Sequence, residues 1–210
     1  MSSAIDSLRL AELLCARMSH DLSGTIGTLA GALEMLDDPS VAAEALAVVN
    51  QAAADLRGRL ELQRAAWGPT GQSLDLAALR HLAEGLPHAK RCTTDFSSLP
   101  EDTVFAPPFA RVTLNLLLLA SEALNGSGEV TLAGSGTDLI IAIAGLRAAW
   151  PTGLAGCLAS EAGAWAAVQD ARSLQAPLTA LLARALGLRL TMLMSAGPGG
   201  PAPPLRLCKV

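Results

Sequence analysis

The sequence predicts an α+β protein in which an N-terminal antiparallel helical hairpin precedes a region of mixed helices and strands. Apolar residues recur every three or four positions over roughly the first 66 residues, which is typical of amphipathic helices. A Gly-Pro-Thr-Gly segment at 68–71 interrupts this pattern, and alternating apolar strands become frequent after it. We therefore expect two domains, a hairpin at residues 1–68 and an α+β domain at residues 69–210.

The hairpin prediction rests on two apolar stripes separated by a short break. The first helix is expected at 7–36 and the second at 41–66; Pro39 cannot continue a helix, and Ser40 is the expected N-cap of the second. The stripes comprise Cys15, Met18, Leu22, Ile26, Leu29, Leu33 and Leu36, then Leu46, Val49, Ala53, Leu56, Leu60 and Gln63. Because a lone hairpin cannot cover its own stripe, we expect two copies to pair in a dimeric four-helix bundle.

After the boundary, the spacing predicts alternating helices and strands. Helices are expected at 74–83, 107–124 and 174–186, strands at 92–96, 188–194 and 205–210, and a β-hairpin at 129–133 and 139–144. Residues 197–204 form a predicted proline- and glycine-rich loop. This order favours an α+β second domain.

Composition excludes several classes of protein. The 210 residues are 51% hydrophobic with a net charge of −4, which excludes a disordered chain and argues against nucleic acid or an anionic membrane as the main partner. The apolar run at 116–120 is far shorter than a membrane span. Four widely spaced cysteines form no CxxC pair. We expect a soluble protein of the reducing cytoplasm.

His20 is the first candidate for chemistry. On a helix it points away from the apolar stripe, and Gly24, Gly27 and Gly31 follow at spacings of four, three and four residues. Each glycine costs a helix about 0.5–1 kcal/mol relative to alanine. The glycines either let a partner's backbone approach the imidazole, or reflect tight helix packing or compositional drift.

The imidazole of His20 is a nitrogen nucleophile near pH 7. Asp21 follows directly in sequence, so the two side chains diverge by default on a helix. Asp21 is either a solvated helix residue or a carboxylate that orients the imidazole or raises its basicity.

The segment from Met18 to Leu22 resembles the H-box of the dimerisation and phosphotransfer domain of two-component histidine kinases. In that motif His20, Asp21 and Leu22 match the histidine, the acidic residue and the leucine. An ATP-binding α+β domain follows the hairpin in such kinases, so the resemblance extends along the whole chain.

The kinase resemblance fails at each nucleotide element. Leu119 stands where the asparagine box of 115–120 carries its magnesium-binding asparagine, and leucine offers no oxygen ligand. Residues 144–148 lack the carboxylate of the adenine-reading turn, and residues 175–178 replace the Gly-x-Gly-Leu that covers the phosphates. Thr25 replaces the usual proline after the histidine. We expect a degenerate histidine-kinase-ATPase-like α/β sandwich that does not bind nucleotide.

This combination is similar to the ChpT-type histidine phosphotransferases of alphaproteobacterial phosphorelays. The resemblance implies a homodimer in which His20 accepts a phosphoryl group from the phospho-aspartate of a hybrid histidine kinase's receiver domain and passes it to a response regulator. Asp21 would assist, and Arg17, Ser23, Gly24 and Gly27 would form the docking surface. The protein would need no cofactor of its own, because the receiver supplies Mg²⁺.

Two other functions stay open at this stage. One is an ATP-dependent histidine kinase, or a fragment of one, which the missing nucleotide motifs disfavour. The other is a non-enzymatic dimeric adaptor in which His20 is merely exposed.

Overall fold

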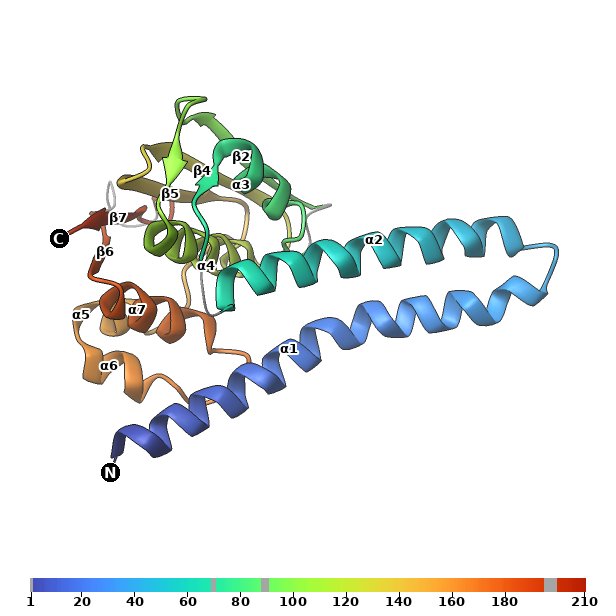
Figure 1. The fold of residues 1–210 in the computed structure, drawn as a ribbon, viewed down its shortest axis with the longest axis horizontal. Helices are drawn as coiled ribbons and strands as arrows, with labels where there is room; N and C mark the ends of the chain where they lie inside the picture. The colour runs from blue at the N-terminus through green and yellow to red at the C-terminus, as the bar shows by residue number, and fades with distance from the viewer. Residues whose placement is uncertain (1, 69–70, 88–90, 195–199) are drawn as a thin grey trace.

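The predicted hairpin is present in the structure, a computed structural model that describes residues 2–68, 71–87, 91–194 and 200–210. Helix α1 (Ser2–Glu34) and helix α2 (Ala42–Trp67) run antiparallel, joined by the short 3₁₀ helix η1 (Met35–Asp37). The joined end of the hairpin projects away from the rest of the molecule, while the N-terminal half of α1 passes beside the C-terminal region, residues 71–210 (Figure 1). The first helix therefore belongs both to the hairpin and to its junction with the C-terminal region.

The turn of the hairpin is organised by Asp38 and not by the predicted cap. The N-cap of α2 is Val41, and it makes no side-chain capping hydrogen bond. The Asp38 carboxylate instead accepts hydrogen bonds from the Ser40 amide at 2.9 Å and the Ser40 hydroxyl at 2.7 Å. The prediction that Ser40 caps α2 is wrong, because its hydroxyl is engaged by the carboxylate two residues earlier.

The apolar stripe predicted for the hairpin is not buried within one chain. The buried side chains that lie on the two helices near the turn are small, namely Ala32, Ala45 and Ala52. Four large side chains of the predicted stripes remain between 37% and 51% exposed; they are Ile26, Leu33, Leu46 and Leu60. We call these four residues the open apolar face. Small residues between α1 and α2 let the helices approach, and the larger ones are left outside.

The C-terminal region is built on a five-stranded mixed sheet of order β2-β4-β5-β7-β6, in which only β2 and β4 pair in parallel. Its strands are β2 (Cys92–Ser98), β4 (Gly128–Gly134), β5 (Asp138–Ala144), β6 (Leu188–Met192) and β7 (Leu205–Lys209). A separate two-stranded ribbon pairs β1 (Leu74–Asp75) with β3 (Val104–Phe105). The mixed α+β class predicted from the sequence is confirmed.

One face of the sheet is covered by helices, as the alternation along the strands requires. In β5, Leu139, Ile141 and Ile143 are buried, while Ile140 between them is partly exposed. The helices of the region are α3 (Leu76–Ala83), α4 (Pro107–Ala123), α5 (Leu154–Ala159), α6 (Glu161–Ala166) and α7 (Gln175–Ala185). Helix α4 is buried along most of its length and supplies much of the core.

Most predicted elements are found close to their expected bounds, and two helices were not anticipated. Helices α5 and α6 have six residues each, too few for a periodic pattern to appear. The predicted strand at 188–194 ends at Met192. The predicted loop at 197–204 falls in part on residues 197–199, which lie outside the described residues.

A buried asparagine ties the hairpin to the C-terminal region. Asn115 on α4 is fully buried; its amide nitrogen donates to the carbonyl oxygen of Ala66 at 3.0 Å, near the end of α2. Its side-chain oxygen accepts from the Trp67 indole at 3.0 Å and from the Gln175 amide at 3.1 Å. The side chain of Arg111 donates to the carbonyl oxygens of Ala66 and Trp67. These contacts satisfy the last carbonyls of α2 and fix its end between α4 and α7.

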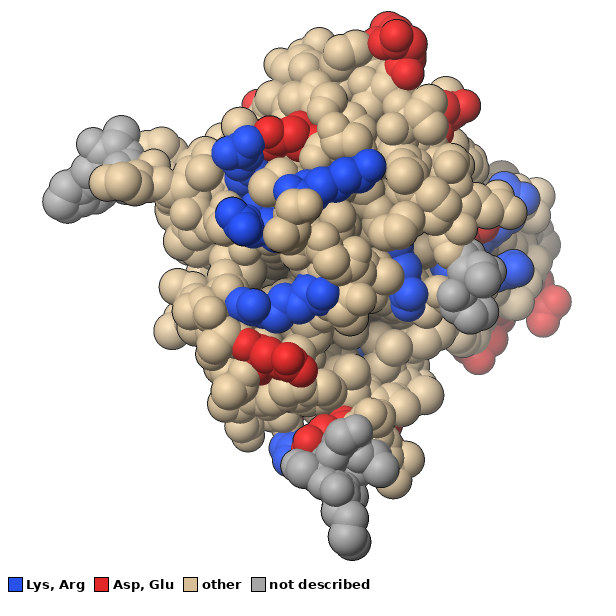
Figure 2. All heavy atoms as spheres, turned by 60° about the vertical axis from the view of Figure 1, so that its left-hand side comes forward, with Lys and Arg blue, Asp and Glu red and all other residues tan. Residues whose placement is uncertain are grey.

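Charge is unevenly distributed although the net charge is only −4. On the face that carries α5–α7 and the last strands, basic side chains gather near the centre (Figure 2). Exposed basic residues of these elements are Arg184, Arg189, Arg206 and Lys209.

No helix in the described ranges combines the length and apolar character needed to cross a bilayer.

Candidate functional site

His20 lies near the middle of α1 with its ring turned to the surface. The side chain is 70% exposed, so the imidazole is accessible to a molecule that approaches the hairpin. This orientation is the one that the helical periodicity predicts. A long helix holds the backbone of His20 in place, while the ring remains free to react.

Asp21 lies against His20 although the two residues are adjacent in sequence. Its Oδ1 is 3.4 Å from His20 Nδ1, near the upper limit of a hydrogen bond, and its side chain is only 17% exposed. The default expectation that neighbouring helix side chains diverge is wrong here, because Arg17 draws the carboxylate to this position. Arg17 Nε donates to Asp21 Oδ2 at 2.9 Å.

Arg17 is almost completely enclosed by its own chain. Besides Asp21, its guanidinium pairs with the Glu122 carboxylate of α4 and donates to the main-chain oxygens of Ala171 at 3.3 Å and Arg172 at 3.4 Å. The expectation that Arg17 forms part of a docking surface does not fit this position. The guanidinium instead joins the helix of His20 to the C-terminal region.

Glu122 is the site residue that sequence reasoning missed. Its pKa is raised to about 7, chiefly because burial penalises the charged form; the Arg17 guanidinium lowers the pKa, and the Asp21 carboxylate makes a smaller contribution that raises it. The single acidic residue of α4 was the available signal, since a carboxyl on a mostly buried helix needs a partner. The sequence could not show that the partner is Arg17, 105 positions away.

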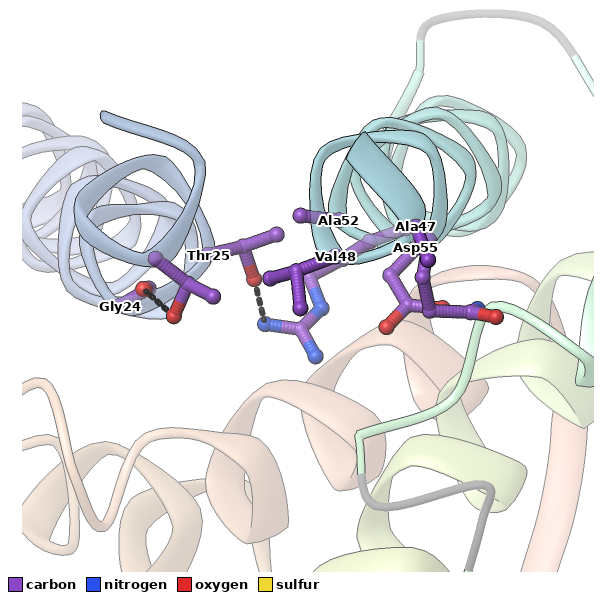
Figure 3. Close-up of a pocket in the computed structure, with 9 residues that line it drawn as sticks. Gly24, Thr25, Ala47, Val48, Ala52 and Asp55 are labelled. Carbon is purple, nitrogen blue, oxygen red and sulfur yellow. Dashed lines mark hydrogen bonds between the residues drawn. The ribbon is translucent and has the colours of Figure 1, made fainter. Parts of the chain in front are cut away.

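A groove between α1 and α2 begins at Gly24, one helical turn C-terminal to His20. It has a volume of about 520 Å³, and Figure 3 shows side chains of both helices converging on it. It is lined by Gly24, Thr25, Thr28, Ala47, Val48, Gln51, Ala52, Asp55 and Arg59. At the end of the groove nearer His20, the Arg59 guanidinium donates to the main-chain oxygen of Asp21 at 2.6 Å and to the Thr25 hydroxyl at 3.5 Å.

Of the other predicted docking residues, only Gly24 lines this groove. Ser23 and Gly27 are exposed on α1 and do not line it. The Ser23 hydroxyl donates to the Ser19 carbonyl at 2.6 Å. A Cβ added at Gly24, Gly27 or Gly31 would meet no atom within 4 Å, so these glycines do not serve close packing inside the chain.

Two residues of the segment that resembles an asparagine box lie in the core of the C-terminal region. Leu119 and Asn115 are both fully buried, and the amide of Asn115 is occupied by the contacts to Ala66, Trp67 and Gln175. Within the described ranges, no three His, Cys, Asp or Glu side chains gather as metal ligands.

Comparisons with known proteins agree with one another. Residues 76–197 match the family model of the histidine phosphotransferase C-terminal domain. The protein phosphotransferase ChpT of Brucella abortus (strain 2308) is 27% identical over 196 residues, covering 90% of this chain and 91% of that protein. A solved structure described as a bacterial phosphotransferase superposes with a TM-score of 0.68 at 25% identity, covering 95% of both chains.

Proposed function

The chain belongs to the histidine phosphotransferases of phosphorelays, and from this premise we propose that His20 is the phosphoacceptor. His20 takes a phosphoryl group from the phospho-aspartate of one receiver domain and passes it to the aspartate of a response regulator. The observation that carries this assignment is the 70% exposed imidazole with a carboxylate at its Nδ1.

The contact with Asp21 favours Nε2 as the attacking nitrogen. An ionised carboxylate only accepts hydrogen bonds, so it favours the tautomer with the proton on Nδ1 and the lone pair on Nε2. That lone pair forms the N–P bond while the P–O bond to the receiver's aspartate breaks. The electron pair of the broken P–O bond stays on the departing aspartate carboxylate. The phosphorylated ring carries a positive charge, which Asp21 stabilises until the reverse step transfers the phosphoryl group to the second aspartate.

In phosphoryl transfer of this kind, the protein that carries the histidine mainly has to present an aligned nucleophile. The transition state is loose, so alignment and charge neutralisation supply most of the catalysis. We assign the Mg²⁺ to the receiver domain, whose oxygen ligands suit a hard cation, and no nucleotide to this chain. The groove lined by Gly24 and Thr28 is our proposed docking position for a receiver, because it starts about 6 Å along the helix from His20.

The second copy of the chain is proposed on the open apolar face. Ile26 and Leu33 on α1, and Leu46 and Leu60 on α2, are spaced seven and fourteen residues apart, as in bundles whose helices pack along one seam. Isolated apolar residues are common on surfaces, but large apolar side chains that repeat at this spacing on paired helices favour burial against another helix pair. We therefore propose a homodimer with a four-helix bundle.

Transfer of labelled phosphate tests the proposed function. A receiver domain carrying ³²P-phospho-aspartate and Mg²⁺ is mixed with the wild-type protein or with His20→Ala, and label on the chain is followed by gel. Wild type is expected to acquire label and the variant none, because the Asp21 carboxylate faces only the Nδ1 of His20 and leaves Nε2 to attack. The exposed ring of His81, by contrast, has a carboxylate at each nitrogen, Glu61 at Nε2 and Glu84 at Nδ1. His81→Ala is the matched control and should accept label like wild type. Equal labelling of His20→Ala would show that the phosphoacceptor lies elsewhere.

Light scattering tests the dimer separately. Ile26→Asp places a charge on a side chain that is half-exposed in one chain, so the monomer is expected to fold and the dimer to dissociate. A dimer that persists in this variant would contradict the assigned face.

Binding of a fluorescent ATP analogue tests the proposal that this chain binds no nucleotide. Saturable Mg²⁺-dependent binding of the analogue would overturn that proposal.

A further inference from the structure

We propose that Arg17 and Glu122 are positioning residues for transfer at His20: Glu122 holds the Arg17 guanidinium, and Arg17 holds the Asp21 carboxylate beside the imidazole. This inference rests on the proposed function, because it assigns roles at the same site. Neither residue touches the phosphoryl group. Both act through Asp21, and one of them comes from the C-terminal region.

Asp21 divides its two oxygens between the reacting ring and the arginine. Oδ1 faces His20 Nδ1 at 3.4 Å, and Oδ2 accepts from Arg17 Nε at 2.9 Å. The orientation of the carboxylate is therefore set on one side by Arg17, which lies one turn earlier on α1. Without that hydrogen bond, Asp21 would be free to rotate toward solvent, as adjacent helix side chains ordinarily do.

Arg17 is itself held at several points. Its Nη2 pairs with Glu122, and its Nη1 donates to the carbonyl oxygens of Ala171 and Arg172. A guanidinium suits this role because its five donors lie in one rigid plane, whereas an ammonium is a single point charge. The planar head thus links two separate segments, α4 and residues 171–172, to the Asp21 carboxylate.

Glu122 is the partner from α4 that neutralises this enclosed cation. The charged groups that act on its carboxyl are Arg17 and Asp21, both on α1. The segment at 171–172 contributes main-chain oxygens to the same guanidinium, and α2 contributes Arg59, which binds the main-chain oxygen of Asp21. The two carboxylates share one arginine, so a change at Glu122 alters how firmly Arg17 holds Asp21.

This arrangement gives the C-terminal region a specific part in the reaction. Helix α4 reaches the phosphoacceptor helix through the Glu122–Arg17 pair and so influences which ring nitrogen of His20 carries the proton. A region that only supported the hairpin mechanically would not affect that tautomer.

The tautomer of His20 is the direct readout. ¹⁵N NMR of the whole protein, recorded at a pH where the spectrum itself shows the His20 ring to be neutral, is expected to find the proton mainly on Nδ1. In Glu122→Gln and Arg17→Gln, the signal should move toward the tautomer mixture of a histidine in a short peptide. The rate of phosphoryl transfer from a phosphorylated receiver should fall by about tenfold to a hundredfold in both, since misplacement of an aligned group carries a cost of that size.

Two further variants separate positioning from simple charge balance. Arg17→Lys keeps the positive charge but not the planar set of donors, so it is expected to show the same tautomer shift and the same loss of rate. It also provides the test if Glu122→Gln does not fold. Arg206→Gln breaks an ion pair in the sheet, between Arg206 and Asp138, and is expected to leave both readouts unchanged.

A wild-type tautomer, or a wild-type transfer rate, in Glu122→Gln or in Arg17→Lys would overturn the positioning role. The NMR measurement needs no receiver, so it decides this question independently of transfer. If His20→Ala accepted label as wild type does, the proposed function would fail; if only the tautomer stayed unchanged, the positioning role alone would fail.

Discussion

Replacing Gly24 by alanine is expected to stabilise the protein and yet slow phosphoryl transfer. Gly24 lies in the regular part of α1, is exposed, and has room for a methyl group, since an added Cβ meets no atom within 4 Å. The substitution therefore gains helix propensity without a clash. The expected gain is about 1 kcal/mol in the free energy of unfolding.

The opposite effect on transfer follows from the position of Gly24. It lines the groove one turn from His20, about 6 Å along the helix axis. A methyl group there would hold a docked receiver away from the imidazole. Because alignment dominates this reaction, we expect the transfer rate to fall by about tenfold.

Gly31→Ala is the matched control. It offers the same open space for a Cβ, but it lies about 16 Å along the helix from His20 and does not line the groove. Urea denaturation should show a similar gain in the free energy of unfolding for both variants. Thermal unfolding should show a rise in Tm of about 2–4 °C for both. Only Gly24→Ala should transfer phosphate more slowly. Equal transfer rates in the two variants would refute the docking argument, and a loss of stability in Gly24→Ala would refute the packing argument.

Three further outcomes are expected. The pKa of Glu122 is raised from 4.5 to about 7 in the folded protein, so the contribution of Glu122 to stability is present at low pH and is lost as pH rises through 7. Relative to Glu122→Gln, the wild-type protein should lose about 2–3 kcal/mol of unfolding free energy between pH 5 and pH 8, as measured by urea denaturation. Parallel pH dependences of the two proteins would contradict this. Asn115→Ala leaves the Trp67 indole and the Gln175 amide without their shared acceptor, so unfolding followed by tryptophan fluorescence should show a loss of at least about 2 kcal/mol; a smaller loss would mean that other groups replace the acceptor. Gly187→Ala should destabilise by about 1 kcal/mol, opposite in sign to Gly24→Ala, because Gly187 has φ +67° just after α7; an unchanged Tm would show that alanine adopts this conformation without cost.

The sequence by itself determined the order and type of most elements. Periods of three to four residues marked α1 and α2, and alternation marked strands such as β5, because burial of one face imposes these spacings locally. It also singled out His20 and Asp21, since the motif that contains them is contiguous. The sequence did not predict helices α5 and α6, because six residues do not complete two helical turns and so show no periodic pattern.

Only the tertiary structure decided how the site is assembled. Arg17 meets Glu122 across 105 positions and the carbonyl oxygens of 171–172 across about 155, and no local pattern encodes such pairs. The same contacts turned Asp21 toward His20, against the default divergence of helix neighbours. The physical reason is that periodicity reports which face of an element is buried, whereas partners across a core depend on how the chain as a whole packs.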